Sequence, residues 1–433
     1  MLKTILLIAM LASVVSIQDD VVSAARSFTD LLAKKDFAAA EAQFDDTMKT
    51  AMPHGKLEET WTTLLSQAGE FKQQGKARTE NRGAYTIVFI TCDFEKAKLD
   101  VRVVLDQAKH VSGLFFGAAT NVDYSPAPYV KPDAFKDSEV VIGSGEWTLP
   151  GTLSMPVGKG PFPAIVLVHG SGPNDRDETI SVNKPFRDLA EGLASKGIAV
   201  LRYEKRSRVY PGKFGSSFTV KEEVVDDALA AVALLRKTEG INPKRIFVLG
   251  HSLGGMLVPR IGKQDPAIAG LISLAGATRH LEDVIPVQYE YLFSLDGSVS
   301  PEEQAQIDQQ KLIAAEVKAL KPSDVATVKF YFGAPPTYWL DLRDYDPPQL
   351  AKTLSQPLLI LQGERDYQVT MLDFNNWKTA LAAKKNVSFK TYPELNHLFM
   401  SGTGKGNPGE YDQVGHVDAR VLDDIAAWIT AQK

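Results

Sequence analysis

Cysteine is almost absent from the 433-residue chain: Cys92 is its only thiol, and its seven histidines are scattered. A single cysteine excludes a disulfide framework within the chain, and no Cys/His cluster has the spacing of a zinc site. We therefore expect no required metal and no other cofactor. Basic residues are not in excess either, with 48 Lys and Arg against 53 Asp and Glu and a net charge of -5. Without a basic stripe, nucleic acid is not expected as a main partner.

Long apolar runs are also scarce. The run at the N-terminus, within "MLKTILLIAMLASVVS", covers about 13 residues, fewer than the roughly 20 that span a bilayer. One lysine, the apolar run and the small residues Val14 and Ser16 are typical of a secretory signal peptide, which we expect at residues 1–16. The alternative is a buried N-terminal helix. We expect an exported protein, periplasmic or secreted, with no stable membrane insertion.

The hydrophobic pattern changes along the chain and predicts two domains. Residues 20–70 place apolar positions at helical spacing, and from Tyr85 the period shifts towards two, as in antiparallel strands. Helices followed by strands predict a small α+β domain over residues 20–123. The proline-rich stretch 124–137 is the expected linker.

After the linker, apolar strands alternate with helical patterns. The segment 139–156 indicates a hairpin, and six apolar runs follow, from "PAIVLVHG" to "VSFKTYPE". Strands that are apolar on both faces are typical of a parallel sheet covered by helices. The sequence therefore predicts an α/β domain over residues 138–433. Its one long interruption, residues 280–356, is the expected lid insertion.

The stretch "RIFVLGHSLGGML" reads as strand, sharp turn and helix around Ser252. A serine at the apex of such a turn has strained backbone geometry, and side chains two residues to either side would collide. Gly250 and Gly254 remove those collisions. The string G-x-S-x-G alone also fits an ordinary glycine-rich turn, so its context must decide.

That context consists of polar residues at the ends of other predicted strands. Asp366 follows "PLLILQG" and His397 follows "VSFKTYPE". In a parallel sheet these strand ends share one edge, where ligands bind. An imidazole can deprotonate a serine hydroxyl, and a carboxylate fixes the imidazole's tautomer. Glu364 is the alternative acid and His416 the alternative base; Asp366 and His397 are preferred.

The chain order Ser252, Asp366, His397 and the "HGSGP" segment after the first buried strand resemble the α/β-hydrolase fold. Residues 138–433 are similar to secreted bacterial serine carboxylesterases that carry an extra N-terminal domain. The resemblance implies Ser252 as nucleophile, Asp366 as acid and His397 as base. It also implies an oxyanion hole formed by the backbone N–H groups of Leu253 and Ser171. "HGSGP" departs from the longer glycine run of many lipases.

These residues predict a serine hydrolase that cleaves small carboxylic esters through an acyl-enzyme. One alternative is a peptidase or amidase with the same triad. An alternative of another class is a catalytically inactive binding protein. The oligomeric state is left open.

Some polar and aromatic residues allow two interpretations each. Arg176, in "NDRDE", is expected to be a structural ion-pair hub rather than a substrate anchor, and His169 and His251 are expected to shape their turns. The insertion is rich in aromatics, and Tyr338 and Trp339 are the candidates for walling the acyl pocket, which would favour short acyl chains. The alternative is that these aromatics form the insertion's own core.

Overall fold

The computed structural model describes residues 20–82, 85–118, 124–213, 215, 217–326 and 329–432, and the expected signal peptide lies outside them. The chain divides into two compact units, one ending at Tyr124 and the other beginning at Ser125. Among the described residues, no helix has both the length and the apolar character needed to cross a bilayer.

The first unit is a small α+β domain. Its helices precede a four-stranded antiparallel sheet in which each strand pairs with the next one in sequence. Alternate residues of β2 and β3, such as Ile90 and Val101, point into a core that the helices cover with Phe28 and Trp61. The elements are a helix over residues 20–33, α2 (Phe37–Glu41), α3 (Asp46–Ala51), α4 (Lys56–Ala68), β1 (Phe71–Arg82), β2 (Tyr85–Phe94), β3 (Lys98–Leu105) and β4 (Val111–Ala118).

The second unit is built on an eight-stranded sheet with the order β12-β11-β10-β9-β7-β8-β6-β5. From β8 to β12 the neighbours are parallel, whereas β5 and β6 form an antiparallel hairpin and β6 also runs antiparallel to β8. The strands are β5 (Phe135–Ile142), β6 (Leu149–Pro156), β7 (Phe162–Val168), β8 (Ala199–Tyr203), β9 (Ile241–His251), β10 (Gly270–Leu274), β11 (Leu358–Gly363) and β12 (Val387–Tyr392).

Helices cover both faces of this sheet, as the apolar character of its strands predicts. One core contains side chains of α7, α8 and α13 together with Val166 and Val248, and the other contains side chains of α5 and α14 together with Ile165 and Phe247. Every residue of β8, β10 and β11 is buried. The flanking helices are α5 (Pro185–Ala194), α7 (Asp226–Lys237), α8 (Leu253–Gln264), α12 (Pro347–Lys352), α13 (Met371–Ala380) and α14 (Ala419–Ala431).

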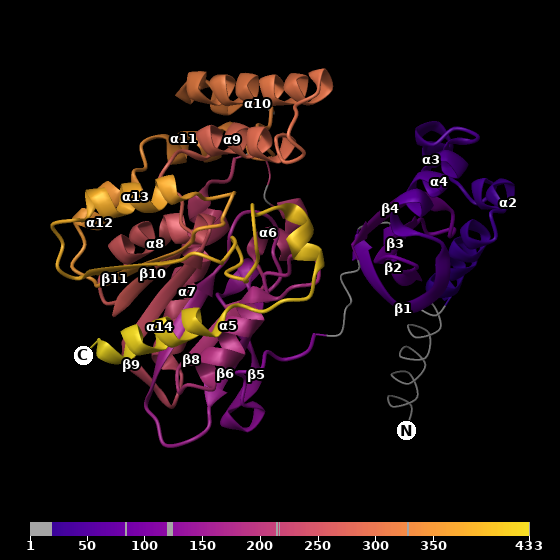
Figure 1. Cartoon of the computed structure of the whole chain (residues 1–433). Helices are drawn as coiled ribbons and strands as arrows, with labels where there is room; N and C mark the ends of the chain where they lie inside the picture. The colour runs from indigo at the N-terminus through magenta and orange to yellow at the C-terminus, as the bar shows by residue number, and fades with distance from the viewer. Residues whose placement is uncertain are drawn as a thin grey trace, which may run out of the picture. The chain divides into compact units, whose positions relative to one another are not determined.

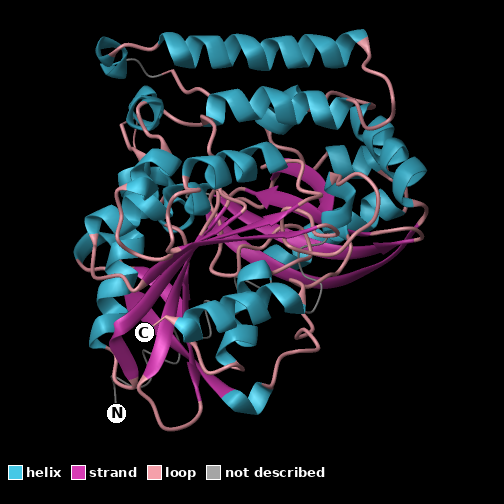
Figure 2. Cartoon of the chain, turned by 60° about the vertical axis from the view of Figure 1, so that its left-hand side comes forward, coloured by secondary structure: helices cyan, strands magenta, loops and turns pink. Residues whose placement is uncertain are grey.

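The crossover from β10 to β11 carries the insertion. Two of its helices, α9 and α10, pack against each other outside the helices that flank the sheet (Figures 1 and 2). Helix α9 is attached to the loop after β11, because Gln288 Nε2 donates to the carbonyl oxygen of Gln368 at 3.0 Å and the rings of Tyr291 and Tyr367 stack at 5.3 Å. The insertion's elements are α9 (Leu281–Phe293), α10 (Pro301–Ala319), the 3₁₀ turn η5 (Pro322–Ala326) and α11 (Pro336–Arg343).

Two of the predicted boundaries differ from the structure. Strand β5 begins at Phe135, so the last residues of the expected linker belong to the sheet. Helix α12, at the end of the expected insertion, packs against α8 and α13 and is therefore part of the helical layer. Residues before β5 also belong to the second unit, since the hydroxyl of Tyr129 donates to the carbonyl oxygen of Val417 at 2.8 Å.

Candidate active site

Ser252 occupies the turn between β9 and α8, where the strand order places β9 in the middle of the sheet. Its backbone has φ 52° and ψ -115°, a left-handed conformation that a side chain makes costly. The strand β10 fixes this conformation, because the N–H of Ser252 donates to the carbonyl oxygen of Leu274 at 2.9 Å. The serine is thus held at the carboxyl edge of the sheet as predicted.

The glycines two residues to either side of Ser252 are required by space. A Cβ at Gly250 would lie 2.1 Å from the carbonyl oxygen of Gly254, and a Cβ at Gly254 would lie 2.3 Å from the carbonyl oxygen of Val168. These neighbours are backbone atoms, which cannot rotate away. The turn therefore excludes every other residue type at both positions.

His397 and Asp366 form a buried pair. His397 Nδ1 lies 2.6 Å from Asp366 Oδ2, and both residues are at most 4 % exposed. Asp366 Oδ2 also accepts from Gln362 Nε2 at 3.1 Å, and Oδ1 accepts from the backbone N–H groups of Gln368 at 2.8 Å and Val369 at 3.0 Å. These donors fix the carboxylate so that it faces the imidazole.

The two alternative residues have other partners. Glu364 is exposed and accepts a hydrogen bond from the hydroxyl of Thr391 at 2.6 Å. His416 Nδ1 lies 3.0 Å from Asp188 Oδ1, on the face of the sheet that α5 covers. Neither residue lines the cavity described next.

Ser252 and His397 line one cavity of about 740 Å³. In the described part of the chain, the Ser252 hydroxyl makes no direct hydrogen bond to His397, and catalytic contacts of this kind are often loose before substrate binds. Most of the cavity wall is apolar, and the insertion supplies much of it. Lining residues from the insertion include Leu281, Val284, Ile285, Phe330, Phe332, Tyr338 and Trp339.

Two backbone N–H groups at the cavity are available as donors. Leu253 is the first residue of α8, and Ser171 follows β7, the strand next to β9; both residues line the cavity. Within the described residues, neither N–H has an intramolecular acceptor. Leu253 lies at a helix N-terminus, which attracts negative charge, so its N–H suits an oxyanion beside Ser252.

Tyr338 and Trp339 both line the cavity and belong to the core beneath the insertion. They are 6 % and 4 % exposed, respectively. Trp339 Nε1 donates to the carbonyl oxygen of Tyr331 at 3.0 Å, and the ring of Tyr338 meets Phe218 edge-on. Their rings are therefore fixed walls of the cavity.

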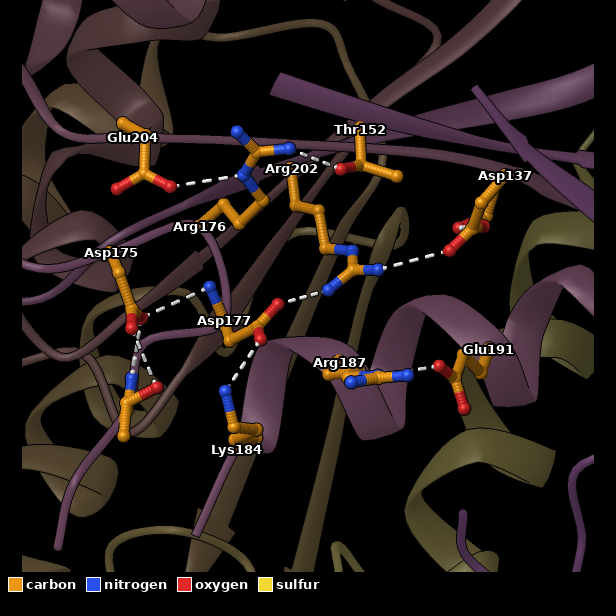
Figure 3. Close-up of polar contacts among 12 residues, drawn as sticks. Asp137, Thr152, Asp175, Arg176, Asp177, Lys184, Arg187, Glu191, Arg202 and Glu204 are labelled. Atoms are coloured by element: carbon orange, nitrogen blue, oxygen red, sulfur yellow. Dashed lines mark hydrogen bonds and ion pairs between the residues drawn. The ribbon is translucent and has the colours of Figure 1, made fainter. Parts of the chain in front are cut away.

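Arg176 takes part in ion pairs and does not line the cavity. Its Nε donates to Glu204 at 2.9 Å, and its Nη1 donates to the hydroxyl of Thr152 at 2.6 Å (Figure 3). The same Nη1 also donates to Glu139 at 2.6 Å. The ion-pair interpretation therefore fits the structure. His169 is a turn residue, as expected: its Nε2 lies 3.0 Å from the carbonyl oxygen of Asp175, and burial lowers the pKa of His169 to about 4.

Three buried residues at the site were not anticipated from the sequence. Gln362 donates to Asp366, Lys205 Nζ donates to the carbonyl oxygen of Gly170 at 2.8 Å, and Glu178 accepts from the N–H of Gly170 at 2.6 Å. Glu178 lies in the acidic "NDRDE" segment and Lys205 in "EKR", and charged runs of this kind usually lie in solvent. Only their place after a buried strand could have singled them out.

The fold and this arrangement of residues define the second unit as an α/β-hydrolase. The chain belongs to the family described as serine aminopeptidase S33, whose model matches residues 161–403. In the first unit, residues 25–114 match DUF3887, a family of unknown function. Among the described residues, no group of three or more His, Cys, Asp or Glu side chains could hold a metal ion.

Known proteins similar to the chain include esterases. Esterase EstD of Thermotoga maritima is 39% identical over 405 residues, which cover 93% of this chain and 93% of that protein. A monoacylglycerol lipase of Mycolicibacterium smegmatis is 24% identical over 253 residues, covering 57% of this chain and 83% of the lipase. The solved structure of Est1E from Butyrivibrio proteoclasticus has a TM-score of 0.44 and 17% identity, covering 68% of this chain and 98% of Est1E. The chain is an esterase-like hydrolase.

Proposed function

We propose that the chain hydrolyses short-chain carboxylic esters through an acyl-enzyme on Ser252, with His397 as the base and Asp366 as the acid. The observation that carries the proposal is the buried pair of His397 Nδ1 and Asp366 Oδ2, 2.6 Å apart, at a cavity that Ser252 also lines. Asp366 holds the tautomer of His397 that leaves Nε2 free to accept a proton.

In the proposed reaction, His397 Nε2 takes the proton of the Ser252 hydroxyl while Oγ attacks the ester carbonyl carbon. The carbonyl oxygen gains the negative charge and accepts hydrogen bonds from the N–H groups of Leu253 and Ser171. The intermediate collapses to the acyl-enzyme, and the alcohol leaves with the proton from His397. Water then attacks the acyl carbon, gives its proton to the same nitrogen, and releases the carboxylic acid and free Ser252.

A peptidase or amidase is the second candidate, because the family is described as a serine aminopeptidase family. An aminopeptidase has to bind the ammonium group of its substrate, and the carboxylates that line the cavity are Glu178 and Glu223. Each already faces an internal cation: Glu178 Oε2 lies 2.9 Å from His251 Nδ1, and Glu223 Oε1 lies 3.0 Å from Lys205 Nζ. This pairing favours an uncharged ester substrate.

A fluorophosphonate probe and a pair of matched substrates test the proposal. The probe should label the wild type at Ser252, as located by peptide mapping, and should leave Ser252→Ala unlabelled. An activated acetate ester should be turned over far faster than the matched acetanilide. Absence of both labelling and turnover would favour the inactive binding protein, and faster cleavage of the anilide would favour the amidase.

The acyl preference follows from the fixed aromatic walls. We propose acyl chains of roughly two to four carbons, because a walled pocket cannot gain the ~0.8 kcal/mol per buried methylene that an open groove would provide. The rest of the 740 Å³ cavity would take the alcohol portion of the ester. In a series of activated esters, Trp339→Phe, which vacates part of the wall, should shift the optimum to longer chains. A wild type that prefers long chains would contradict the proposal.

We also propose that the protein is exported and that its mature form begins near Ile17. Residues 1–16 have the features of a secretory signal peptide. Expression in a bacterial host with separation of the cell fractions, followed by N-terminal sequencing, tests the proposal. An uncleaved chain found in the cytoplasm would contradict it.

A further inference from the structure

His251, the residue before Ser252, is buried between two hydrogen-bond acceptors. Its Nε2 lies 2.9 Å from the carbonyl oxygen of His397, and its Nδ1 lies 2.9 Å from Glu178 Oε2. The second contact is an ion pair rather than an aligned hydrogen bond. A doubly protonated imidazole would match both of these acceptors. Burial alone would lower the pKa of His251, but the Glu178 carboxylate outweighs burial and the pKa is raised.

The other oxygen of Glu178 reaches the loop that holds Ser171. Glu178 Oε1 accepts from the N–H of Gly170 at 2.6 Å, and the carbonyl oxygen of Gly170 accepts from Lys205 Nζ at 2.8 Å. In a planar trans peptide, the carbonyl of Gly170 and the N–H of Ser171 point in opposite directions. Holding that carbonyl therefore also fixes the direction of the N–H proposed for the oxyanion hole.

Glu178 is itself held firmly. It is 1 % exposed and has a φ of 50°, which is uncommon for a residue with a side chain. The residues before it are fixed by their own contacts: Arg176 pairs with Glu139 and Glu204, and Asp177 pairs with Lys184 and Arg202 (Figure 3). These contacts over-determine the backbone, so that Glu178 stays directed at Gly170 and His251.

A series of side-chain contacts joins two loops of the site. It runs from Gly170 through Glu178 and His251 to the carbonyl oxygen of His397. A buried ion pair adds little net stability, because the cost of desolvation offsets the attraction. Its position between the two loops has a different consequence: the distance between the oxyanion donors and the imidazole is fixed by side-chain contacts. Misplacement of reacting groups by about 1 Å can cost about 100-fold in rate.

We propose that Glu178 and His251 are positioning residues, which hold Gly170, the residue before Ser171, and the backbone of His397 in register with Ser252. The inference rests on the proposed function. Neither residue takes part in the proton transfers, although the ring of His251 packs against that of His397 with centroids 4.6 Å apart. Their loss should therefore lower kcat and leave KM nearly unchanged.

The first test replaces Glu178 and uses Asp188 as a matched control. Asp188 is also buried, its carboxylate also accepts from a histidine nitrogen and a backbone N–H, those of His416 and Val417, and it does not line the cavity. Glu178→Ala should lower kcat for a short activated ester by about 100-fold or more, with KM changed less than about threefold. Glu178→Gln keeps an acceptor for the N–H of Gly170 and should recover most of the rate. Asp188→Ala should lower the thermal midpoint while kcat of the folded protein stays near wild type.

The second test replaces His251 by two amide residues, each of which imitates one of its ring nitrogens. It keeps the inference testable if Glu178→Ala fails to fold. His251→Gln places an amide N–H near the position of Nε2 and keeps the donor to the carbonyl of His397. His251→Asn places it near Nδ1 and keeps the contact with Glu178 instead. If His251 contributes to stability alone, the asparagine variant should have both the higher kcat and the higher thermal midpoint. Positioning predicts that the glutamine variant is faster by about tenfold or more, even if it melts lower.

Equal kcat in the two amide variants, or a wild-type kcat in folded Glu178→Ala, would overturn the inference. So would an equal loss of kcat in Asp188→Ala, since the effect would then be one of general stability. If instead the wild type neither hydrolyses esters nor reacts with the fluorophosphonate probe, the proposed function itself fails. The two failures are therefore distinguishable.

Discussion

The substitution Asp366→Asn should nearly abolish ester hydrolysis while leaving the fold intact. The wild-type carboxylate accepts four hydrogen bonds, one from His397 Nδ1 at 2.6 Å, one from Gln362 and two from backbone N–H groups. The amide that replaces it can keep its oxygen on the backbone donors, and its NH₂ group then faces Nδ1. The imidazole is forced into the tautomer with the proton on Nε2, which cannot accept the proton of Ser252.

The size of the effect follows from the loss of the working tautomer. In Ser-His-Asp enzymes this change costs about 10⁴ in kcat, equivalent to about 5 kcal/mol at about 1.36 kcal/mol for each tenfold change. Substitution of Glu364 by glutamine is the matched control, because that side chain is exposed and its hydrogen bond is to the hydroxyl of Thr391, away from the cavity. It should change kcat less than about threefold, since surface substitutions rarely perturb a site.

The assay is kcat for an activated acetate ester, with the thermal midpoint and the rate of fluorophosphonate labelling measured on the same samples. Asp366→Asn should unfold near the wild-type temperature and label slowly. A folded Asp366→Asn within tenfold of wild type would refute the reasoning. So would Glu364→Gln being the slower variant, because the acid would then be the exposed carboxylate.

Three further outcomes are expected. Ser252→Ala and His397→Ala should each remove several orders of magnitude of kcat and the double variant no more, because both residues act at one transition state; a double variant much slower than either single one would contradict this. The hydrogen bond to Asp188 raises the pKa of His416, so this pair stabilises the fold fully below the ordinary histidine pKa of about 6.5 and loses that contribution as pH rises through the raised value. The urea midpoint of wild type should therefore exceed that of His416→Gln more at pH 6 than at pH 9, and a constant difference would count against the pair. A chain beginning at Ser125, the first residue of the second unit, should retain turnover of a small activated ester; if it folds and is inactive, the first unit completes the site.

The sheet and the order of the polar strand ends were predictable because both depend on short-range patterns. The inner strands are apolar on both faces, and Ser252 and Asp366 each follow one of them within a few residues, whereas His397 follows the half-exposed edge strand β12. The structure brings His397 to Asp366 and directs both Ser252 and His397 into one cavity. The choice of Asp366 over Glu364 depends on which side of a short turn faces inward, which the sequence does not specify.

Other features depend on contacts between distant segments. The first residues of β5, 135–137, were predicted as linker because the strand lies at the sheet edge and exposes most of its side chains, so its composition resembles that of a loop. Glu178 and His251 are 73 positions apart in the sequence numbering, and each resembles an ordinary turn residue when seen alone. Helix α12 could not be separated from the insertion by pattern, because only its packing on α8 and α13 assigns it to the helical layer that flanks the sheet.

The attachment of the insertion at a single crossover has a consequence for how such enzymes diversify. The parallel register of β10 and β11 is maintained by the strands themselves and does not depend on what joins them. Doubling the length of a flexible connection costs only about 0.6 kcal/mol in loop closure, so the segment from α9 to α11 can change in length at little cost where the core contacts of Tyr338 and Trp339 are kept. Ser252 and His397 are carried by other strands, and Asp366 follows β11, beyond that segment. Selection can therefore act on substrate range and on catalysis through separate stretches of the gene.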